Sequence, residues 1–468
     1  MTLLDELLGA LGTKYVLTGA DCAPWVTDWT GKYTSNPLAV LRPGSTDEVS
    51  AVMRIAHDHG TAVVPVSGRT GLTGGGQAGP DALILSLDRM NRIRDIRPKA
   101  HLAIVDAGVV LETLHGAVAE HGLSFPMTFG AKGSAMIAGM LSTNAGGSNV
   151  LRYGNMRDLC LGLEVVLPDG TRLDLMRELH KDNSGYDLKN LFIGAEGTLG
   201  VITGAVLKLV PAPRAFATAM VAVPTLTDAL DLLNHLQTGT GGAVEAFEYM
   251  PAAYVARLQE MHPDSRPPFA DRHEVNLLIE VGALATRDAT PAADGSLPIV
   301  SYLEELLAER MEDGQVVDAV IAQNDAQRAE MWARREAAAE VSLSRNPIVN
   351  NDIALPLDVI DGFFTRMQEV LQDLDPGADT LSVAHLGDGN IHYCVYPSNA
   401  ALCDPVMEAV EDVVLSLGGS FSAEHGIGLS KLPSMRRRKS PAALQVMRQI
   451  KHAMDPKGIM NPGKLLPE

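Results

Sequence analysis

The hydrophobic positions of the chain switch between a period of two and a period near 3.6, which predicts short strands interleaved with amphipathic helices. In the first half we expect strands at 38–43, 61–66, 82–90, 100–108 and 201–210, and helices at 45–60 and 110–121. Ser45, with Glu48 three residues on, forms a capping-box pattern that should begin the first of these helices. The segment 162–175 predicts a hairpin that turns at Pro168-Asp169-Gly170.

A domain boundary is expected at Pro211-Ala212-Pro213, because two prolines in three residues favour an extended connection. Beyond it the pattern is of the α+β kind. Strands are expected at 216–223, 243–249, 274–281 and 315–321, and helices at 226–238, 251–260, 299–312 and about 326–345. A strand–loop–strand element follows at 381–396, and the C-terminal residues are helical with a tail rich in glycine and proline.

Composition narrows the classes of function. The chain has 468 residues, and its net charge of −19 disfavours binding to nucleic-acid backbones and anionic membrane surfaces. Its four cysteines are far apart and form no CxxC pair, so neither a disulfide framework nor a Cys-based zinc site is expected. No apolar run approaches the roughly 18 residues of a membrane span. The acidic N-terminus is unlike a signal peptide, so we expect a cytoplasmic protein without a transmembrane segment.

The loop SGRTGLTGGGQAG at 67–79 is the first candidate binding element. It contains a formal GxGxxG at 74–79, but Pro80 and a strand pattern follow where a Rossmann fold needs a helix. Its glycines can instead turn successive backbone amides toward a phosphate. A second glycine-rich stretch lies at 129–149. Either stretch alone could be a tight turn without a ligand, but the two together in one domain predict a dinucleotide cradle.

Two histidines suggest a metal centre in the second half. His385 and His392 bracket a turn at Asp388-Gly389, which could fold the chain back so that the two side chains converge. Glu424 and His425 come 32 and 33 residues after His392. Two histidines and a glutamate that leave one coordination position open are typical of a catalytic site for a divalent metal ion. These ligand types favour zinc. Histidines that are only hydrogen-bonded structural groups remain the alternative at this point.

The first two hundred residues resemble the FAD-binding domain of the vanillyl-alcohol-oxidase (PCMH-type) flavoproteins. The matching segments occur in the same order at 42–49, 64–75, 142–158, 165–171 and 185–203. The second half resembles the C-terminal domain of FAD-linked oxidases such as the D-2-hydroxyglutarate and D-lactate dehydrogenases. That resemblance rests on HLGDGNIH at 385–392 and EHG at 424–426.

The resemblance implies an α+β protein in three parts. Residues 1–212 should form a PCMH-type FAD-binding domain of two α/β subdomains. Residues 213–418 should form an α+β substrate (cap) domain with an antiparallel sheet, and residues 419–468 a helical segment that returns to the flavin site. FAD should be bound non-covalently, because the first loop lacks the histidine to which some relatives attach it.

The resemblance also assigns residues to the cofactor, the metal and the substrate. The FAD residues are Pro65, Ser67, Gly68, Arg69, Thr70, Gly71, Leu72, Thr73, Gly74, Gly133, Ser134, Gly139, Asn144, Gly146, Gly147, Tyr153, Glu196, Gly197, Gly200, Ile202 and Asn461. The metal ligands are His385, His392 and Glu424, and the catalytic base is His425. The substrate residues are Arg335, Asn350, Asn390, Cys394 and His425.

Two of these positions, and one further position near Arg335, depart from the 2-hydroxyglutarate pattern. The relatives have a threonine where this chain has Ala339, a lysine at Asn350 and an asparagine at Cys394. Cys394 should share one strand face with Asn390 and His392. It could act there as a small hydrophobic residue or as a thiol near the metal. The departures leave open which D-2-hydroxy acid is used.

The expected activity is the oxidation of a D-2-hydroxy acid by a homodimeric enzyme. The metal would bind the α-hydroxyl and carboxylate, His425 would take the hydroxyl proton, and the C2 hydride would pass to flavin N5. Because no nicotinamide fingerprint is present, electrons should leave through an acceptor such as an electron-transfer flavoprotein or a quinone. The alternatives are a metal-independent flavin oxidase of an alcohol or sugar, and a non-catalytic flavoprotein.

Overall fold

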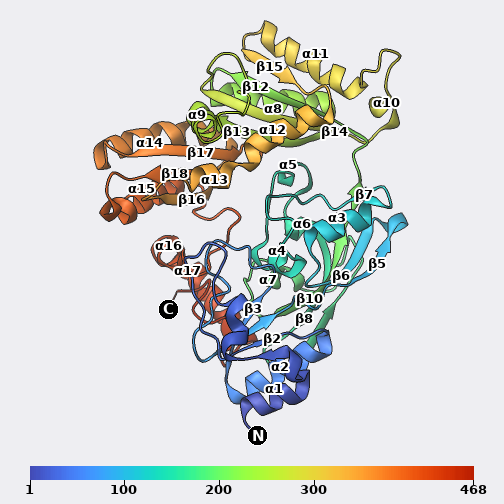
Figure 1. Cartoon of the computed structure of the whole chain (residues 1–468), viewed down its shortest axis with the longest axis vertical. Helices are drawn as coiled ribbons and strands as arrows, with labels where there is room; N and C mark the ends of the chain where they lie inside the picture. The colour runs from blue at the N-terminus through green and yellow to red at the C-terminus, as the bar shows by residue number, and fades with distance from the viewer. Residues whose placement is uncertain (468) are drawn as a thin grey trace. The chain divides into compact units, whose positions relative to one another are not determined.

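The computed structural model describes residues 1–467, and the chain divides by its own contacts into two compact units. Unit 1 comprises residues 1–146, 154–211 and the segment from 424 onward, and unit 2 comprises 147–153 and 212–423. The chain therefore returns to unit 1 at Glu424 after completing unit 2. Figure 1 labels the elements of both units.

The first sheet of unit 1 has four strands in the order β1-β2-β4-β3. These are β1 (Val16–Leu17), β2 (Ala39–Leu41), β3 (Ala62–Val66) and β4 (Ala82–Ser86). Strands β2, β4 and β3 are parallel, and β1 pairs antiparallel with β2. The C-terminal tail adds to the β3 edge, because the Val63 amide donates to the Ile459 carbonyl (2.8 Å) and the Asn461 amide donates to the Val63 carbonyl (2.8 Å).

Helix α2 (Thr46–His59) begins after Ser45, as its sequence predicts, but only half of the capping box forms. The Ser45 hydroxyl accepts a hydrogen bond from the Glu48 amide at 3.2 Å. The Glu48 carboxylate accepts from the amide of Gly44 at 2.6 Å instead of from Ser45. The prediction of a reciprocal capping box was therefore wrong by one residue, since Glu48 bonds the residue before the N-cap.

The second sheet of unit 1 is antiparallel, in the order β5-β6-β10-β8-β9. Its strands are β5 (Ile93–Arg97), β6 (Leu102–Asp106), β8 (Cys160–Val166), β9 (Arg172–Leu175) and β10 (Val201–Lys208). Pairing of β8 with β9 confirms the hairpin that the sequence predicts. Gly170 occupies its turn with a φ of 83°, a conformation that favours glycine. A short pair joins β7 (Leu123–Ser124) to β11 (Val210–Pro211).

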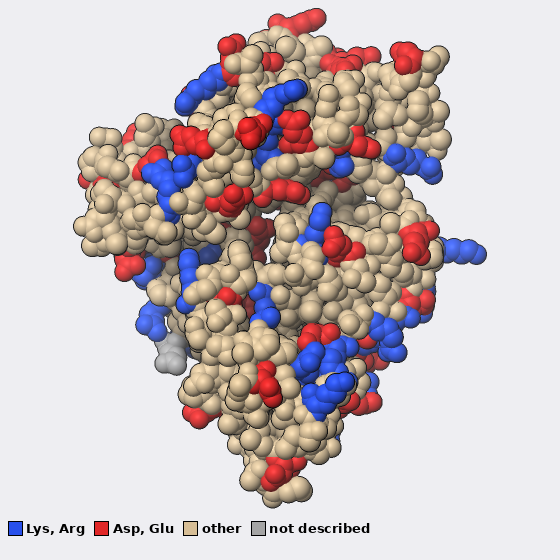
Figure 2. Space-filling view, viewed as in Figure 1, with Lys and Arg blue, Asp and Glu red and all other residues tan. Residues whose placement is uncertain are grey.

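The other helices of unit 1 are α1 (Leu3–Leu11), α3 (Leu111–Ala119), α4 (Ile137–Thr143), α6 (Met156–Leu159), α7 (Lys189–Phe192), α16 (Leu432–Arg438) and α17 (Pro441–Met454). Over residues 1–467, no helix is both long and apolar enough to cross a membrane. On the face shown in Figure 2, acidic and basic side chains are interspersed over the surface of each unit.

Unit 2 is built on a seven-stranded sheet in the order β15-β12-β14-β13-β17-β18-β16, with every neighbouring pair antiparallel. The strands are β12 (Ala215–Val223), β13 (Val244–Pro251), β14 (Val275–Ala283), β15 (Asp318–Ile321), β16 (Val349–Ala354), β17 (Asp379–His385) and β18 (Asn390–Tyr396). These findings confirm the α+β class, with an antiparallel sheet in the second half.

Helices cover both faces of this sheet. One face packs against α8 (Leu226–Thr240), α11 (Pro298–Glu312), α14 (Ile360–Leu374) and α15 (Cys403–Ser416). The opposite face packs against α9 (Ala252–Met261), α12 (Asp325–Glu336) and α13 (Ala338–Ser342). Two short helices, α5 (Val150–Tyr153) and α10 (Thr286–Ala289), complete unit 2.

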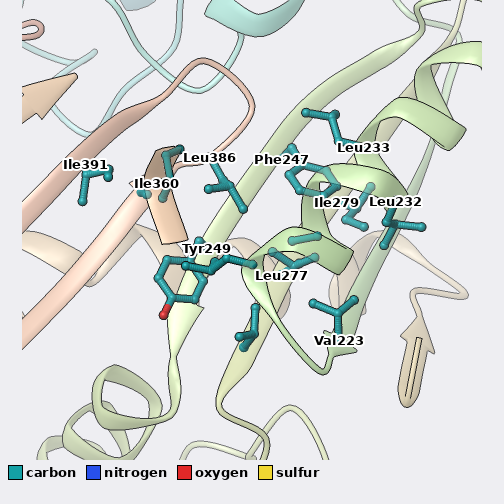
Figure 3. Packing of buried hydrophobic residues seen from close by; sticks show 14 of the residues in the cluster. Val223, Leu232, Leu233, Phe247, Tyr249, Leu277, Ile279, Ile360, Leu386 and Ile391 are labelled. Carbon is teal, nitrogen blue, oxygen red and sulfur yellow. The ribbon is translucent and has the colours of Figure 1, made fainter. Parts of the chain in front are cut away.

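Residues that alternate along each strand of unit 2 enter different cores. Leu277 and Ile279 of β14 belong to the core under α8, whereas Leu278 between them belongs to the core under α9 and α12. Figure 3 shows Phe247 and Ile279 beside Leu232 in the first of these cores. Because both faces are buried, a polar side chain in a central strand must find a partner inside the unit.

The single long helix expected at about 326–345 is absent. Helix α12 ends at Glu336, and the shorter α13 begins at Ala338. The interruption is the single residue Ala337, two residues after the buried Arg335.

Candidate active site

Polar side chains gather on the face of the unit 2 sheet that packs against α9, α12 and α13. The strand register places Glu248 opposite His385, His385 opposite Asn390, and Asp352 opposite His392. The residues that flank them on the same face belong to the core under α9 and α12: Met250, Leu381, Val383, Cys394 and Tyr396. Strand alternation alone therefore brings a row of ionisable and amide side chains across four neighbouring strands.

His385 is held by a buried carboxylate. Its Nδ1 lies 2.8 Å from Oε1 of Glu248, and Oε2 of the same carboxylate accepts from Nε of Arg335 at 2.7 Å. Burial raises the pKa of Glu248, but its contacts with His385 and Arg335 outweigh burial, so its pKa lies below the ordinary value. The His385 and His392 rings are 5.7 Å apart between centroids and cross at 77°. The two histidines are thus close, as their spacing around the turn predicts.

Asp352 and His392 supply a pair of candidate metal ligands. A carboxylate oxygen of Asp352 and a ring nitrogen of His392 lie within 4.8 Å of each other. Asn390 donates through Nδ2 to Asp352 Oδ1 and to the Ile353 carbonyl, at 3.0 Å each. Its own Oδ1 is buried without a hydrogen-bond partner. Imidazole nitrogen, carboxylate oxygen and an unsatisfied amide oxygen together fit a divalent cation and the water it carries.

The two positions expected to tune the substrate pocket contact each other. Cys394 Sγ lies 3.5 Å from Oδ1 of Asn350, its cross-strand partner. Burial raises the pKa of the Cys394 thiol to about 11. Its neighbours in the core include Val383 and Tyr396. Cys394 is therefore a protonated, packed thiol at neutral pH.

In unit 1, the two glycine-rich stretches meet. A Cβ on Gly68 would lie 2.3 Å from the Ser134 carbonyl oxygen, and a Cβ on Gly139 would lie 3.2 Å from Cβ of Ser67. The glycines are thus required by the close approach of the loop at 67–76 to the start of α4. Ser67 Oγ is buried and has no hydrogen-bond partner. A donor left unsatisfied beside two glycine-rich backbones fits a bound phosphate group.

The segment that follows Glu424 is anchored to the same loop within unit 1. The Thr73 hydroxyl lies 3.3 Å from the His425 carbonyl oxygen. The Glu196 carboxylate accepts from the amides of Ile427 and Gly428, at 2.7 Å each. Burial raises the pKa of Glu196, and these two amides offset part of the rise. The backbone next to His425 is therefore fixed by two predicted cofactor residues.

Asn461, in the C-terminal tail, bonds both the glycine-rich loop at 67–79 and the backbone at Glu196. Its Nδ2 donates to the Gly75 carbonyl at 3.0 Å and to the Glu196 carbonyl at 2.8 Å. Its Oδ1 is buried without a partner. Together with Ser67 Oγ, it gives unit 1 two buried oxygens whose hydrogen-bonding capacity fits a polar cofactor such as FAD.

Several predicted FAD residues make protein contacts that the sequence did not indicate. Arg69 donates to the carbonyl of Pro24, and Asn144 Oδ1 accepts from the Arg157 amide at 2.9 Å. Tyr153, with Gly147, belongs to unit 2, where its hydroxyl lies 2.9 Å from Oε1 of Glu245. The remaining predicted FAD residues all lie in unit 1: Pro65, Thr70, Gly71, Leu72, Gly74, Gly133, Gly146, Gly197, Gly200 and Ile202.

Of the predicted catalytic and metal residues, His385 and His392 lie in unit 2, and Glu424 and His425 lie in unit 1. Glu424 Oε1 and His425 Nε2 are 3.7 Å apart. Sequence reasoning missed Glu248 and Asp352. Glu248 was marked by one signal, a carboxylate inside a strand between the apolar Ala246 and Met250, two residues away on either side. Asp352, between Asn350 and Ala354, carried no such signal.

A glycine-rich cradle in one α+β unit and a histidine–carboxylate cluster on the sheet of another define a two-part nucleotide-dependent oxidoreductase. The chain belongs to the FAD-linked oxidases. A family described as "FAD linked oxidases, C-terminal domain" matches residues 212–465, and an "FAD binding domain" family matches residues 37–176.

Relatives match over nearly the whole chain. D-2-hydroxyglutarate dehydrogenase of Xanthomonas citri pv. viticola is 37% identical over 453 residues, 95% of this chain and 93% of the relative. The mitochondrial D-2-hydroxyglutarate dehydrogenase of Bos taurus is 37% identical over 446 residues, 94% of this chain and 79% of the relative. The structure of p-cresol methylhydroxylase aligns with a TM-score of 0.75 at 15% identity, covering 100% of this chain and 96% of the other. These matches confirm the PCMH-type fold and identify an FAD-linked oxidoreductase.

Proposed function

We propose that this protein oxidises a D-2-hydroxy acid, of the D-2-hydroxyglutarate or D-lactate kind, to the 2-oxo acid with metal assistance. The names of the relatives support the reaction class. The observation that carries the proposal is the cluster on one sheet face of unit 2. There Asp352 and His392 bring their ligand atoms within 4.8 Å of each other, beside the buried, unsatisfied Asn390 oxygen. His385 is the cross-strand partner of Asn390, and its ring centroid lies 5.7 Å from that of His392.

His385, His392 and Glu424 would hold the metal, as the sequence predicts, with Asp352 as a further carboxylate. The Ala423 amide donates to the Asp352 carbonyl at 3.2 Å within unit 2, and Glu424 follows Ala423 directly in the chain. This continuity supports the inclusion of Glu424. Zinc suits a set of imidazole and carboxylate ligands.

FAD held by the unit 1 cradle would supply the acceptor for the C2 hydride, and a divalent metal would supply the Lewis acidity that makes the substrate's α-hydroxyl easier to deprotonate. His425 takes the hydroxyl proton, a role for which an imidazole is suited near neutral pH. The Arg335 guanidinium pairs with a substrate carboxylate through its terminal nitrogens. Its Nε is already bonded to Glu248, so the cation is oriented before the substrate arrives. The electrons would then pass to an acceptor such as an electron-transfer flavoprotein or a quinone.

The test is anaerobic mixing of the FAD-loaded protein with a panel of D- and L-2-hydroxy acids, while flavin absorbance is followed. Bleaching by D-acids and not by L-acids is expected, with loss of bleaching after metal chelation. His425→Ala should keep FAD and metal but lose flavin reduction. Full activity of a metal-free preparation would contradict the metal role. Absence of bleaching by every acid in the panel would overturn the proposed activity.

A further inference from the structure

Two buried glutamates on the same sheet face of unit 2 anchor helix α12, but they do so differently. Glu280 accepts from Nε and Nη2 of Arg328 at 2.7 Å each, and from Nε1 of Trp332 at 2.8 Å. Glu248 accepts from Nε of Arg335 at 2.7 Å. Residues 328, 332 and 335 fall on one side of a helix, so one face of α12 is bonded to the sheet through two carboxylates.

Glu248 also contacts a histidine, and Glu280 is bonded to none. Its Oε2 bonds Arg335, and its Oε1 lies 2.8 Å from Nδ1 of His385. An ionised carboxylate can only accept hydrogen bonds, so Nδ1 of His385 carries the proton in this pair. In a neutral imidazole Nε2 then holds the lone pair that binds a metal. The bond to Glu248 therefore selects one tautomer of His385.

Burial makes this selection strict. Glu248 is fully buried and His385 and Arg335 are each less than one-tenth exposed, so water cannot replace the carboxylate. Nη2 of Arg335 lies 3.4 Å from Nε2 and 3.5 Å from Nδ1 of His385, which places the cation against the ring as a whole. The negative charge of Glu248 stabilises the positive charge of Arg335 beside the histidine in this low-dielectric interior.

We propose that Glu248 is a positioning residue that serves two groups at once. It fixes the His385 ring through Nδ1, which leaves the lone pair on Nε2, and it orients the Arg335 guanidinium through Nε. This inference rests on the proposed function for the roles of His385 and Arg335. It adds that one carboxylate couples metal affinity to substrate affinity.

Glu248→Gln is the informative variant. The amide keeps the size of the side chain but has a single acceptor oxygen, so either His385 or Arg335 loses its partner. Removal of such a partner of a metal-binding histidine typically weakens metal binding roughly 10–100-fold. Glu248→Asp keeps the charge and should recover part of the affinity. Glu280→Gln is the matched control, because it makes the same change at a buried glutamate bonded to α12 but not to a histidine.

Two measurements on the FAD-loaded full chain test the inference. The first is zinc affinity by competition with a chelator, accompanied by the KM and kcat for flavin reduction by a D-2-hydroxy acid. Glu248→Gln should lower zinc affinity roughly 10–100-fold and raise KM, whereas Glu280→Gln should leave zinc affinity unchanged. Unchanged zinc affinity and KM in a folded Glu248→Gln protein would overturn the inference while the proposed function stands.

The second measurement needs neither metal nor activity. Nitrogen-15 NMR of histidine-labelled, metal-free protein reports the tautomer of each ring, and His385→Gln assigns the signal. The wild-type signal should be that of an Nδ1-protonated ring, and the Glu248→Asp signal should remain so. A wild-type His385 protonated only at Nε2 would overturn the inference, even if Glu248→Gln did not fold.

Discussion

Asp352 on β16 and His392 on β18 are cross-strand partners whose carboxylate and imidazole ligand atoms lie within 4.8 Å of each other. If both bind the metal, Asp352→Asn should lower zinc affinity by at least roughly tenfold. Loss of a group that only supports a ligand typically costs that much, and loss of a ligand should cost no less. Elemental analysis after dialysis against a chelator would measure this. Asn351→Ala, at the next residue, whose side chain bonds the Tyr393 carbonyl, is the control and should keep its zinc. Equal zinc in both variants would exclude Asp352 as a ligand.

Arg328 compensates the buried Glu280 carboxylate and should matter for stability. Arg328→Met leaves that charge with only its hydroxyl and indole donors, Thr218 and Trp332. We expect a loss of about 2–3 kcal/mol in the free energy of unfolding, less than for a fully buried pair because the Arg328 side chain is 34% exposed. Urea unfolding followed by circular dichroism measures it.

The control for this prediction is Arg287→Met, because the Arg287 side chain is 87% exposed and pairs only with Asp288 at the surface. Its effect should stay below about 1 kcal/mol. Equal effects of the two variants would show that the Arg328 pair contributes no more than a surface contact.

Gly68 should be required for FAD binding. A Cβ at this position would meet the Ser134 carbonyl oxygen at 2.3 Å, so Gly68→Ala must move one of the two glycine-rich backbones. We expect a folded protein that is purified with little FAD, measured by its flavin-to-protein absorbance ratio. Gly79→Ala in the same loop meets no atom within 4 Å and should keep its flavin. Normal flavin content in Gly68→Ala would contradict the cradle described for unit 1.

Glu164 should make unit 1 sensitive to acid. Burial raises the pKa of its carboxyl, but hydrogen bonds from Arg94 (2.7 Å), Thr46 (2.7 Å) and Thr203 (3.0 Å) outweigh burial and hold that pKa below the ordinary 4.5. A carboxyl whose pKa is lower in the folded protein stabilises the fold at any pH above its pKa in the unfolded chain. That stabilisation is lost as the pH falls through its pKa in the folded protein. Melting temperatures between about pH 6 and pH 3 should fall less steeply in Glu164→Gln than in the wild type. Parallel pH profiles would contradict this assignment.

Cys394 should be inert to alkylation in the folded protein. Burial raises the pKa of its thiol to about 11, so almost no thiolate is present near neutral pH. Among the four cysteines, Cys403 is the one that is not fully buried, and it should react first. Mass spectrometry after timed iodoacetamide treatment, with and without urea, distinguishes the two sites. Rapid native labelling of Cys394 would argue for a thiol that is reactive within the site.

Much of the fold could be predicted from local pattern. Elements of unit 2 such as β12, α8 and α11 begin and end within a few residues of their predicted bounds, because their apolar period is strong. The helix expected at about 326–345 is interrupted at Ala337, a turn that its continuous helical pattern did not predict. The predicted return bond from Glu48 to Ser45 is replaced by a bond to Gly44, a choice that residue spacing alone does not decide.

The sequence by itself determined the family of chemistry. The loop at 67–79, the histidines at 385 and 392, and Glu424-His425 are local signals that predict a dinucleotide cradle and a candidate metal centre. Their resemblance to a known family implies an FAD-linked oxidoreductase. Only the tertiary structure decided which distant groups support them. Glu248 meets His385 across 137 positions of sequence, and Asp352 meets His392 across a strand pair, because sheet register is set by long-range packing. The orientation of the histidine that would bind the metal is therefore a property of the folded sheet.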